Sequence, residues 1–179
     1  MKFIFVILIV VLSASFSHSA EEEKVLWREG KKLSWNMFKG NPETLGNYVA
    51  STNSGVSLSF SMKSINGEVT IDYTVQSFFY PNASWYVKEK VNPLILSHEQ
   101  THFDISELFA RKLKEKFATI PRDEDFKEKA QKIYKQNESE RLAMQDLFDE
   151  ETSHSRIEEN EIKWEAYIKQ QLGLCNDWK

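Results

Sequence analysis

Apolar and polar residues alternate in two stretches of the first half of the chain, 56–63 and 69–76. Alternation with a period of two is typical of β-strands that bury one face. The dipeptide Asn66-Gly67 stands between the two stretches, and it is strongly favoured in two-residue hairpin turns. The pattern therefore predicts an antiparallel β-hairpin.

The length of this loop also sets the register of the hairpin, because a shift by one residue would turn every side chain to the opposite face. With a two-residue loop, the apolar residues of the two strands lie opposite one another. The predicted pairs are Met62 with Ile71, Phe60 with Tyr73, and Leu58 with Val75. Turn and alternation thus agree on one register.

The apolar spacing becomes helical after about Trp85. Asn92 followed by Pro93 is a typical helix start, since asparagine caps the first turn and proline is tolerated in it. Pro121 separates this helix from the next. The apolar residues that recur near helical spacing are Leu94, Ile95, Ile105, Leu108, Phe109, Leu113 and Phe117.

The stretch 123–171 contains no proline or glycine and is highly charged. We predict one or two solvated helices there, broken near 152–155, with Gly173 ending the last. Its sparse apolar positions are Phe126, Ala130, Ile133, Leu142, Leu147, Phe148, Ile157, Ile162 and Tyr167. The whole pattern predicts the α+β class, with an N-terminal antiparallel hairpin or sheet followed by long helices.

The first twenty residues have the pattern of a secretory signal peptide. Lys2 precedes an unbroken apolar run from Phe3 to Leu12, and small residues follow up to Ala20. This run is short for a bilayer span, and no later stretch is long and apolar enough to be one. We therefore expect a single domain, residues 21–179, that is secreted or periplasmic.

Charge and cysteine content exclude some partners and some sources of stability. The formal net charge of −4 argues against nucleic acid as a partner. Cys175 is the single cysteine, so no internal disulfide can form. Stability must come from the core or from a metal ion.

The segment His98-Glu99-x-x-His102 carries the candidate chemistry. Residues four apart lie on one helical face, so the two imidazoles can share one Zn²⁺ ion. Glu99 is rotated by about 100° from His98, where it borders the ion and can act as the general base. The same residues also occur together on helices that bind no metal.

A mononuclear catalytic zinc ion takes three protein ligands, and residues 21–179 contain one further histidine, His154. It lies seven residues after Leu147, which would place both on one face of a continuous helix. Glu150 or Glu151 is an alternative third ligand. Glu107 lies about 180° around the helix from the first motif histidine, so it should face away.

Several other polar and aromatic residues are candidates for supporting roles at the site. Asp104 would either orient a ligand histidine or be a plain surface carboxylate. Tyr134 and Tyr167 are weak candidates for donating a hydrogen bond to a developing oxyanion. Trp85 and Tyr86 would either line a cleft or pack in the core, and packing is the commoner role.

Two segments, 94–113 (LILSHEQTHFDISELFARKL) and 147–164 (LFDEETSHSRIEENEIKW), resemble the bacterial secreted zinc-dependent proteases, a family long known as a domain of unknown function. That family has a His-Glu-Gln-x-His-Phe-Asp helix and a later Asp-x-x-Thr-x-His segment, here Asp149 to His154. Met37 replaces a usual acidic residue and Phe148 a usual tyrosine. A hydroxyl that could hold the oxyanion is thus missing at position 148.

The resemblance implies a zincin-like fold in which His98, His102 and His154 bind Zn²⁺ and Glu99 is the base. We accordingly expect a secreted zinc-dependent peptidase acting on a protein or peptide, peptidoglycan cross-links included. The edge of the hairpin could bind an extended peptide as an added strand. Two alternatives remain: a structural zinc site without turnover, needing a carboxylate or Cys175 as a further ligand, and a metal-free helical interaction module.

Overall fold

The computed structural model describes residues 23–42, 48–66, 68–123 and 125–179, so the predicted signal peptide, residues 1–20, lies outside it. The fold is α+β, as predicted. The strands are β1 (Val25–Leu26), β2 (Ala50–Ser51), β3 (Ser54–Ile65), β4 (Glu68–Phe79) and β5 (Trp85–Tyr86), and the helices are α1 (Pro93–Ala118), α2 (Phe126–Thr152) and α3 (Glu158–Leu174).

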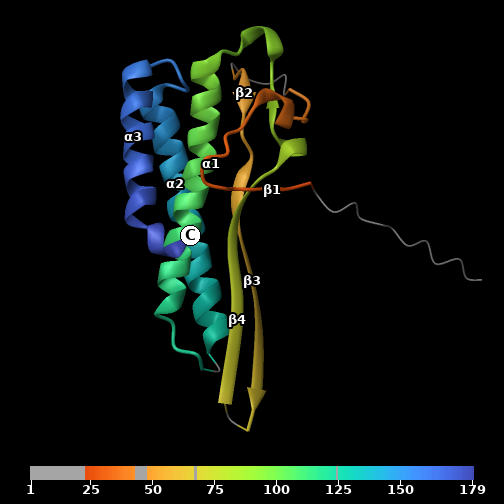
Figure 1. Cartoon of the computed structure of the whole chain (residues 1–179), viewed down its shortest axis with the longest axis vertical. Helices are drawn as coiled ribbons and strands as arrows, with labels where there is room; N and C mark the ends of the chain where they lie inside the picture. Colours follow the sequence, from red (N-terminus) through yellow and green to blue (C-terminus); the bar gives the residue numbers. More distant parts are fainter. Residues whose placement is uncertain (1–22, 43–47, 67, 124) are drawn as a thin grey trace, which may run out of the picture.

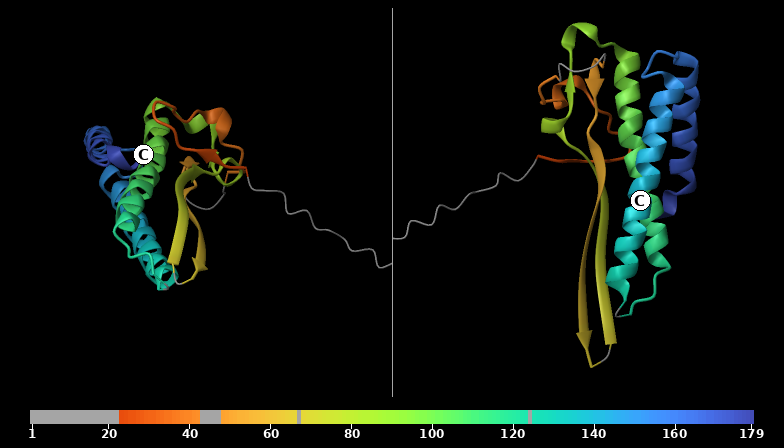
Figure 2. Two further views of the ribbon diagram at one scale, coloured as in Figure 1. Left: turned by 60° about the horizontal axis from the view of Figure 1, so that its bottom comes forward. Right: turned by 180° about the vertical axis from the view of Figure 1, so that it is seen from behind.

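The strands form two small sheets on one side of a layer of helices (Figure 1). One sheet has the order β1-β4-β3, and the other pairs β2 with β5. Helix α1 is central, because it contacts β3, β4, α2 and α3. The tip of the hairpin projects beyond the ends of α1 and α2 (Figure 2). In the part of the chain that the structure describes, no helix combines the length and apolarity needed to cross a membrane.

The hairpin has the predicted register. Strands β3 and β4 are antiparallel, and all three predicted pairs of apolar residues are observed. Ile65 pairs with Glu68, which leaves a two-residue loop. The φ of Asn66 is 53°, as the first position of a type I′ turn requires.

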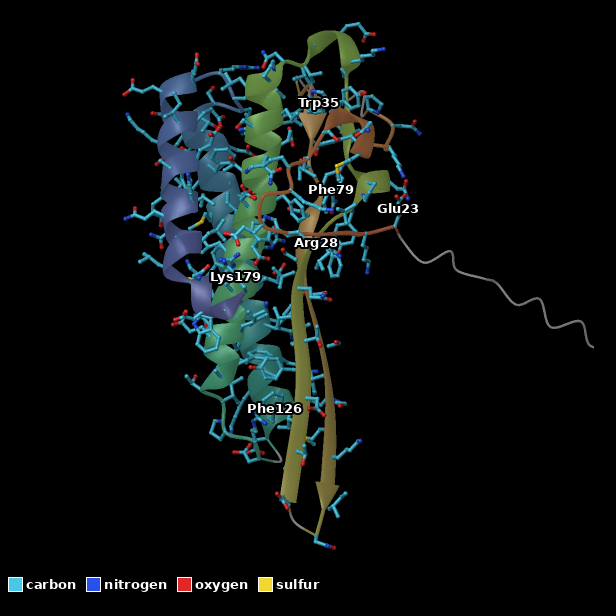
Figure 3. All side chains as sticks on the ribbon, in the orientation of Figure 1. Glu23, Arg28, Trp35, Phe79, Phe126 and Lys179 are labelled. Carbon is cyan, nitrogen blue, oxygen red and sulfur yellow. The ribbon has the colours of Figure 1, made fainter. Side chains whose placement is uncertain are left out.

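The apolar face of the hairpin packs on α1 and α2. Val56 and Val75 belong to the same buried cluster as Leu108 and Leu113 of α1. Phe126 begins α2 on the side of the hairpin (Figure 3), and its ring lies 5.7 Å from that of Phe60. Each fully buried side chain of this size contributes about 1.5–3 kcal/mol, so this packing holds α1 and α2 against the sheet.

Helix α1 starts as predicted, since the Asn92 side chain accepts a hydrogen bond of 3.0 Å from the Ile95 backbone N–H. The predicted break between the later helices is also observed. Helix α2 ends at Thr152, and the next three residues have positive φ. Helix α3 continues through Gly173 to Leu174, so the predicted stop was one residue early.

The buried face of α2 and α3 differs from the one expected from apolar positions alone. Five of those positions are exposed: Leu142, Leu147, Ile157, Ile162 and Tyr167. On α3 the buried residues are Glu161, Trp164 and Ile168. Their spacing of three and seven is helical, but the series begins with a carboxylate, so apolar periodicity could not find it.

Candidate metal centre

Three side chains from two helices converge on one point. His98 and His102 come from α1 and Asp149 from α2. The Nε2 atoms of the two histidines are 3.1 Å apart. Asp149 Oδ1 is 3.0 Å from Nε2 of His98 and 3.1 Å from Nε2 of His102.

This group has the size and chemistry of a site for one metal ion. With bonds of about 2.0–2.1 Å, the ligand atoms of a tetrahedral zinc ion lie about 3.3–3.4 Å apart. The three observed separations are slightly shorter, so a small outward movement of the side chains would fit the ion. Two imidazoles and a carboxylate suit zinc and other first-row metals alike.

The His98 ring is held on two sides. Its Nδ1 lies 2.7 Å from Oε1 of Glu161, a fully buried residue of α3. Because an ionised carboxylate only accepts hydrogen bonds, Nδ1 carries the proton. The Phe148 ring stacks on the imidazole with centroids 4.5 Å apart and an interplanar angle of 24°. Nε2 is thereby directed at the convergence point.

The His102 ring is held by Gln145 of α2. Gln145 Nε2 donates a 2.9 Å hydrogen bond to the backbone carbonyl of His102. Its Oε1 therefore accepts a hydrogen bond from Nδ1 of the same histidine. This leaves the Nε2 atom of a neutral His102 ring free for a metal ion.

The electrostatics of the metal-free group favour a proton on His98. Burial lowers the pKa of His98, but its hydrogen bonds to the carboxylates of Asp149 and Glu161 outweigh burial and raise the pKa to about 9. Burial raises the pKa of Asp149, but its hydrogen bonds to the two histidines hold it well below its usual value. A half-buried anion is thus paired with a cation in the absence of metal.

Glu99 is 4 % exposed. Its Oε2 has no hydrogen-bond partner among the described residues, which is costly for a buried carboxylate. Its negative charge helps to raise the pKa of neighbouring His98. A free carboxylate oxygen beside a metal site is what a general base requires.

His154 lies beside the group but outside it. Its Nδ1 is 3.4 Å from Asp149 Oδ1, and its side chain is 43 % exposed. The helical-phase argument for it was wrong, because Leu147 is 44 % exposed and α2 ends before His154 is reached. The role of His154 as third ligand therefore stays a prediction, with Asp149 as the residue that the geometry favours.

The other candidates lie elsewhere. Glu150 and Glu151 are exposed, and Glu151 accepts a hydrogen bond from Trp164 Nε1. Glu107 faces away, as predicted, and binds Arg111 and Ser77.

Asp104 orients no histidine, because it accepts hydrogen bonds of 2.7 Å from Trp27 Nε1 and Gln100 Nε2. It is largely buried and attaches the N-terminal segment to α1, so it is no plain surface group either. The Tyr134 hydroxyl donates to the Val56 carbonyl, which removes it from the site.

The remaining aromatic candidates have packing roles or lie at the surface. Trp85 is buried, and Tyr86 stacks on Trp35 with ring centroids 4.9 Å apart, so packing is confirmed for both. Tyr167 is exposed and lies edge-on to Trp164. A tyrosine that was not considered, Tyr48, lies edge-on to the His154 ring at 4.9 Å.

Three functional candidates were missed: Asp149 as a possible ligand, and Gln145 and Glu161 as residues that hold the histidines. Gln145 and Asp149 are four apart on α2, so a search for polar residues at helical spacing before the break would have found both. Glu161 gave no such signal, because it stands in a run rich in glutamate.

Residues 25–155 match the profile of a family described as "Bacterial protein of unknown function (DUF922)". The chain belongs to this family. No curated protein and no solved structure matches it. The matched segment contains the two motif histidines, Glu99, Asp149 and His154, whereas α3 with Glu161 lies beyond it. The resemblance to a domain of unknown function is confirmed, and the family's description assigns no activity.

Proposed function

We propose that this protein is a secreted zinc-dependent peptidase. The observation that carries the proposal is the convergence of His98, His102 and Asp149 beside Glu99, whose buried carboxylate has an oxygen without a partner in the described part of the chain. Two imidazoles, a carboxylate ligand and an adjacent glutamate form the donor set of known zinc peptidases. The expected substrate is an amide bond in a protein or peptide, with peptide cross-links of the cell wall included.

In this proposal the three converging side chains hold the ion. A bound zinc ion would supply a Lewis acid that activates water and polarises the scissile carbonyl. Glu99 takes the proton from the attacking water and delivers it to the leaving amine. Phe148 stacks on His98 and lends the site an apolar wall, which strengthens electrostatic interactions inside it.

A substrate would approach from the side of Asp149, the most exposed of the three converging side chains, and of His154 beside it. Two backbone carbonyls of β3 next to the histidines already accept hydrogen bonds from side chains of α2. Ser54, whose hydroxyl contacts the His102 carbonyl, has its own carbonyl bound by Arg141 Nη1. Tyr134 binds the carbonyl of Val56. These two carbonyls are therefore already engaged, and strand addition along the rest of the β3 edge stays a prediction.

The test is metal content and peptide hydrolysis of wild type and Glu99→Gln. We expect about one zinc ion per chain in both proteins and a loss of hydrolysis by roughly 10²–10⁴-fold in the variant. Glu115→Gln is the matched control, since Glu115 is an exposed glutamate on the same helix. An unchanged rate in Glu99→Gln would exclude Glu99 as the base.

A structural metal site is the second candidate, and the position of His154 favours it. With Nδ1 only 3.4 Å from Asp149 Oδ1, His154 could close a four-ligand site that leaves no position for water. This candidate predicts bound zinc without hydrolysis in wild type. The metal-free interaction module predicts no zinc in any variant.

A further inference from the structure

Glu161 is a buried carboxylate from α3 that reaches the metal centre. Its side chain is fully buried, and Oε1 lies 2.7 Å from Nδ1 of His98. Its Oε2 has no hydrogen-bond partner in the described part of the chain. Burying a carboxylate costs several kcal/mol unless a strong donor or a cation compensates. The contact with His98 is therefore the physical reason for an acid at this position.

The start of α3 does not explain Glu161. Acidic side chains in the first turn of a helix interact favourably with its dipole, and Glu158 and Glu159 stand there as well. Both are exposed, so they provide this interaction without losing hydration. A third acidic side chain could interact with the helix dipole equally well from the surface, yet Glu161 is fully buried.

We propose that Glu161 positions His98 for metal binding by keeping the proton on Nδ1 and the lone pair on Nε2, which makes α3 part of the metal centre. The proposal rests on the metal site of the proposed function. A carboxylate behind a ligand histidine fixes its orientation and makes it a stronger donor, and loss of such a partner typically costs about 10–100-fold in metal affinity.

The two motif histidines differ in the charge of the group that accepts the hydrogen bond from Nδ1. His102 is held by the neutral amide of Gln145, whereas His98 is held by a charged group. His98 is thereby the stronger donor of the pair. Phe148 stacks on one face of the His98 ring but offers Nδ1 no acceptor, so the choice of the protonated nitrogen depends on Glu161.

The test compares zinc affinity in three variants of the full chain. Glu161→Gln keeps an acceptor oxygen and removes the charge. Glu161→Leu removes both at similar volume. Glu158→Gln removes an exposed charge from the same helical turn and serves as the control. Affinities are measured by competition with a chromophoric chelator, and the d–d absorption bands of the Co²⁺-substituted proteins report the ligand field.

We expect Glu161→Leu to bind zinc about 10–100-fold more weakly, Glu161→Gln to show a smaller loss, and Glu158→Gln to match wild type. The Co²⁺ bands should shift in the Glu161 variants and stay unchanged in the control. If Glu161→Leu does not fold, the zinc affinity and the Co²⁺ spectrum of Glu161→Gln still test the positioning role.

Equal affinities and spectra in all four proteins would overturn the positioning role. Absence of metal binding in wild type would overturn both this role and the proposed function. If the Glu161 variants lose affinity while wild type hydrolyses no peptide, the positioning role is supported and the peptidase proposal fails.

Discussion

Asp149 is the residue on which the site converges, because its Oδ1 lies within 3.4 Å of ring nitrogens from three histidines. Two of these nitrogens come from helix α1, and the third comes from the turn after α2. A carboxylate shared in this way can be a metal ligand itself or can hold His154 as one. Substituting Asp149 and His154 one at a time shows which of the two side chains binds the metal ion.

Asp149→Ala should weaken zinc binding by about 100-fold or more, because it would remove one of the three proposed ligands. His154→Ala should weaken it by less than about tenfold. The measurement is the zinc dissociation constant, with Asp146→Ala as control, since Asp146 is exposed on the same helix. The opposite ranking would establish His154 as the third ligand, as predicted from the sequence.

The protonation of His98 leads to a pH dependence of the metal-free protein. Its pKa is raised from about 6.5 in the unfolded chain to about 9 in the fold, so its stabilising effect is fully present below pH 6.5 and is lost as the pH rises through 9. The loss should be on the order of a few kcal/mol. Urea unfolding of the chelator-treated protein at pH 6.5 and 9.5 measures it.

His98→Gln is the control for this pH dependence. Its free energy of unfolding should change much less between the two pH values, since the titrating group is gone. A similar drop in wild type and variant would assign the effect to other groups.

At the scale of elements, the turn between α2 and α3 is unusual. Ser153, His154 and Ser155 are consecutive non-glycine residues with φ of 50°, 52° and 64°. The left-handed conformation costs about 1–2 kcal/mol per residue for L-amino acids. The turn places His154 beside Asp149 and lets α3 pack along α1. The backbone strain of this turn therefore lies next to the candidate site.

Ser155→Gly should raise the free energy of unfolding by about 0.5–1 kcal/mol, because glycine adopts positive φ without a Cβ clash. Ser139→Gly, at an exposed position within α2, should lower it by a similar amount. Denaturant unfolding of both variants gives the two values. Destabilisation by Ser155→Gly would show that the serine side chain matters more than the backbone conformation.

At the scale of the molecule, the candidate metal centre and the carboxylate behind it draw on all three helices of the α layer. His98 and His102 come from α1, Asp149 from α2 and Glu161 from α3. A ligand that binds only the folded state stabilises it by mass action. Metal binding should therefore strengthen the packing of all three helices.

Zinc at about 100 times its dissociation constant should raise the free energy of unfolding by about 2.7 kcal/mol, and a chelator should remove the gain. His102→Ala should show a much smaller gain at the same zinc concentration. Thermal or urea unfolding with and without the metal tests this. Identical stability of wild type with zinc and with chelator would favour the metal-free interaction module.

The sequence by itself determined the features that depend on neighbouring residues. Alternation and the Asn66-Gly67 turn specify the hairpin register, Asn92 specifies the start of α1, and the spacing of His98 and His102 places both imidazoles on one face. Each depends on local backbone geometry, which a short window of sequence contains.

Only the tertiary structure decided which distant residues complete the site. Asp149 and Glu161 lie about 50 and 60 residues after His98 in the sequence, and they reach it because the hydrophobic core sets the rotation of α2 and α3. That rotation follows burial across the whole helical layer, where Glu161 is buried and Leu147 is exposed. Long-range packing is not encoded in local periodicity, so the candidate third ligand, Asp149, and the carboxylate behind His98, Glu161, could be found only in the folded structure.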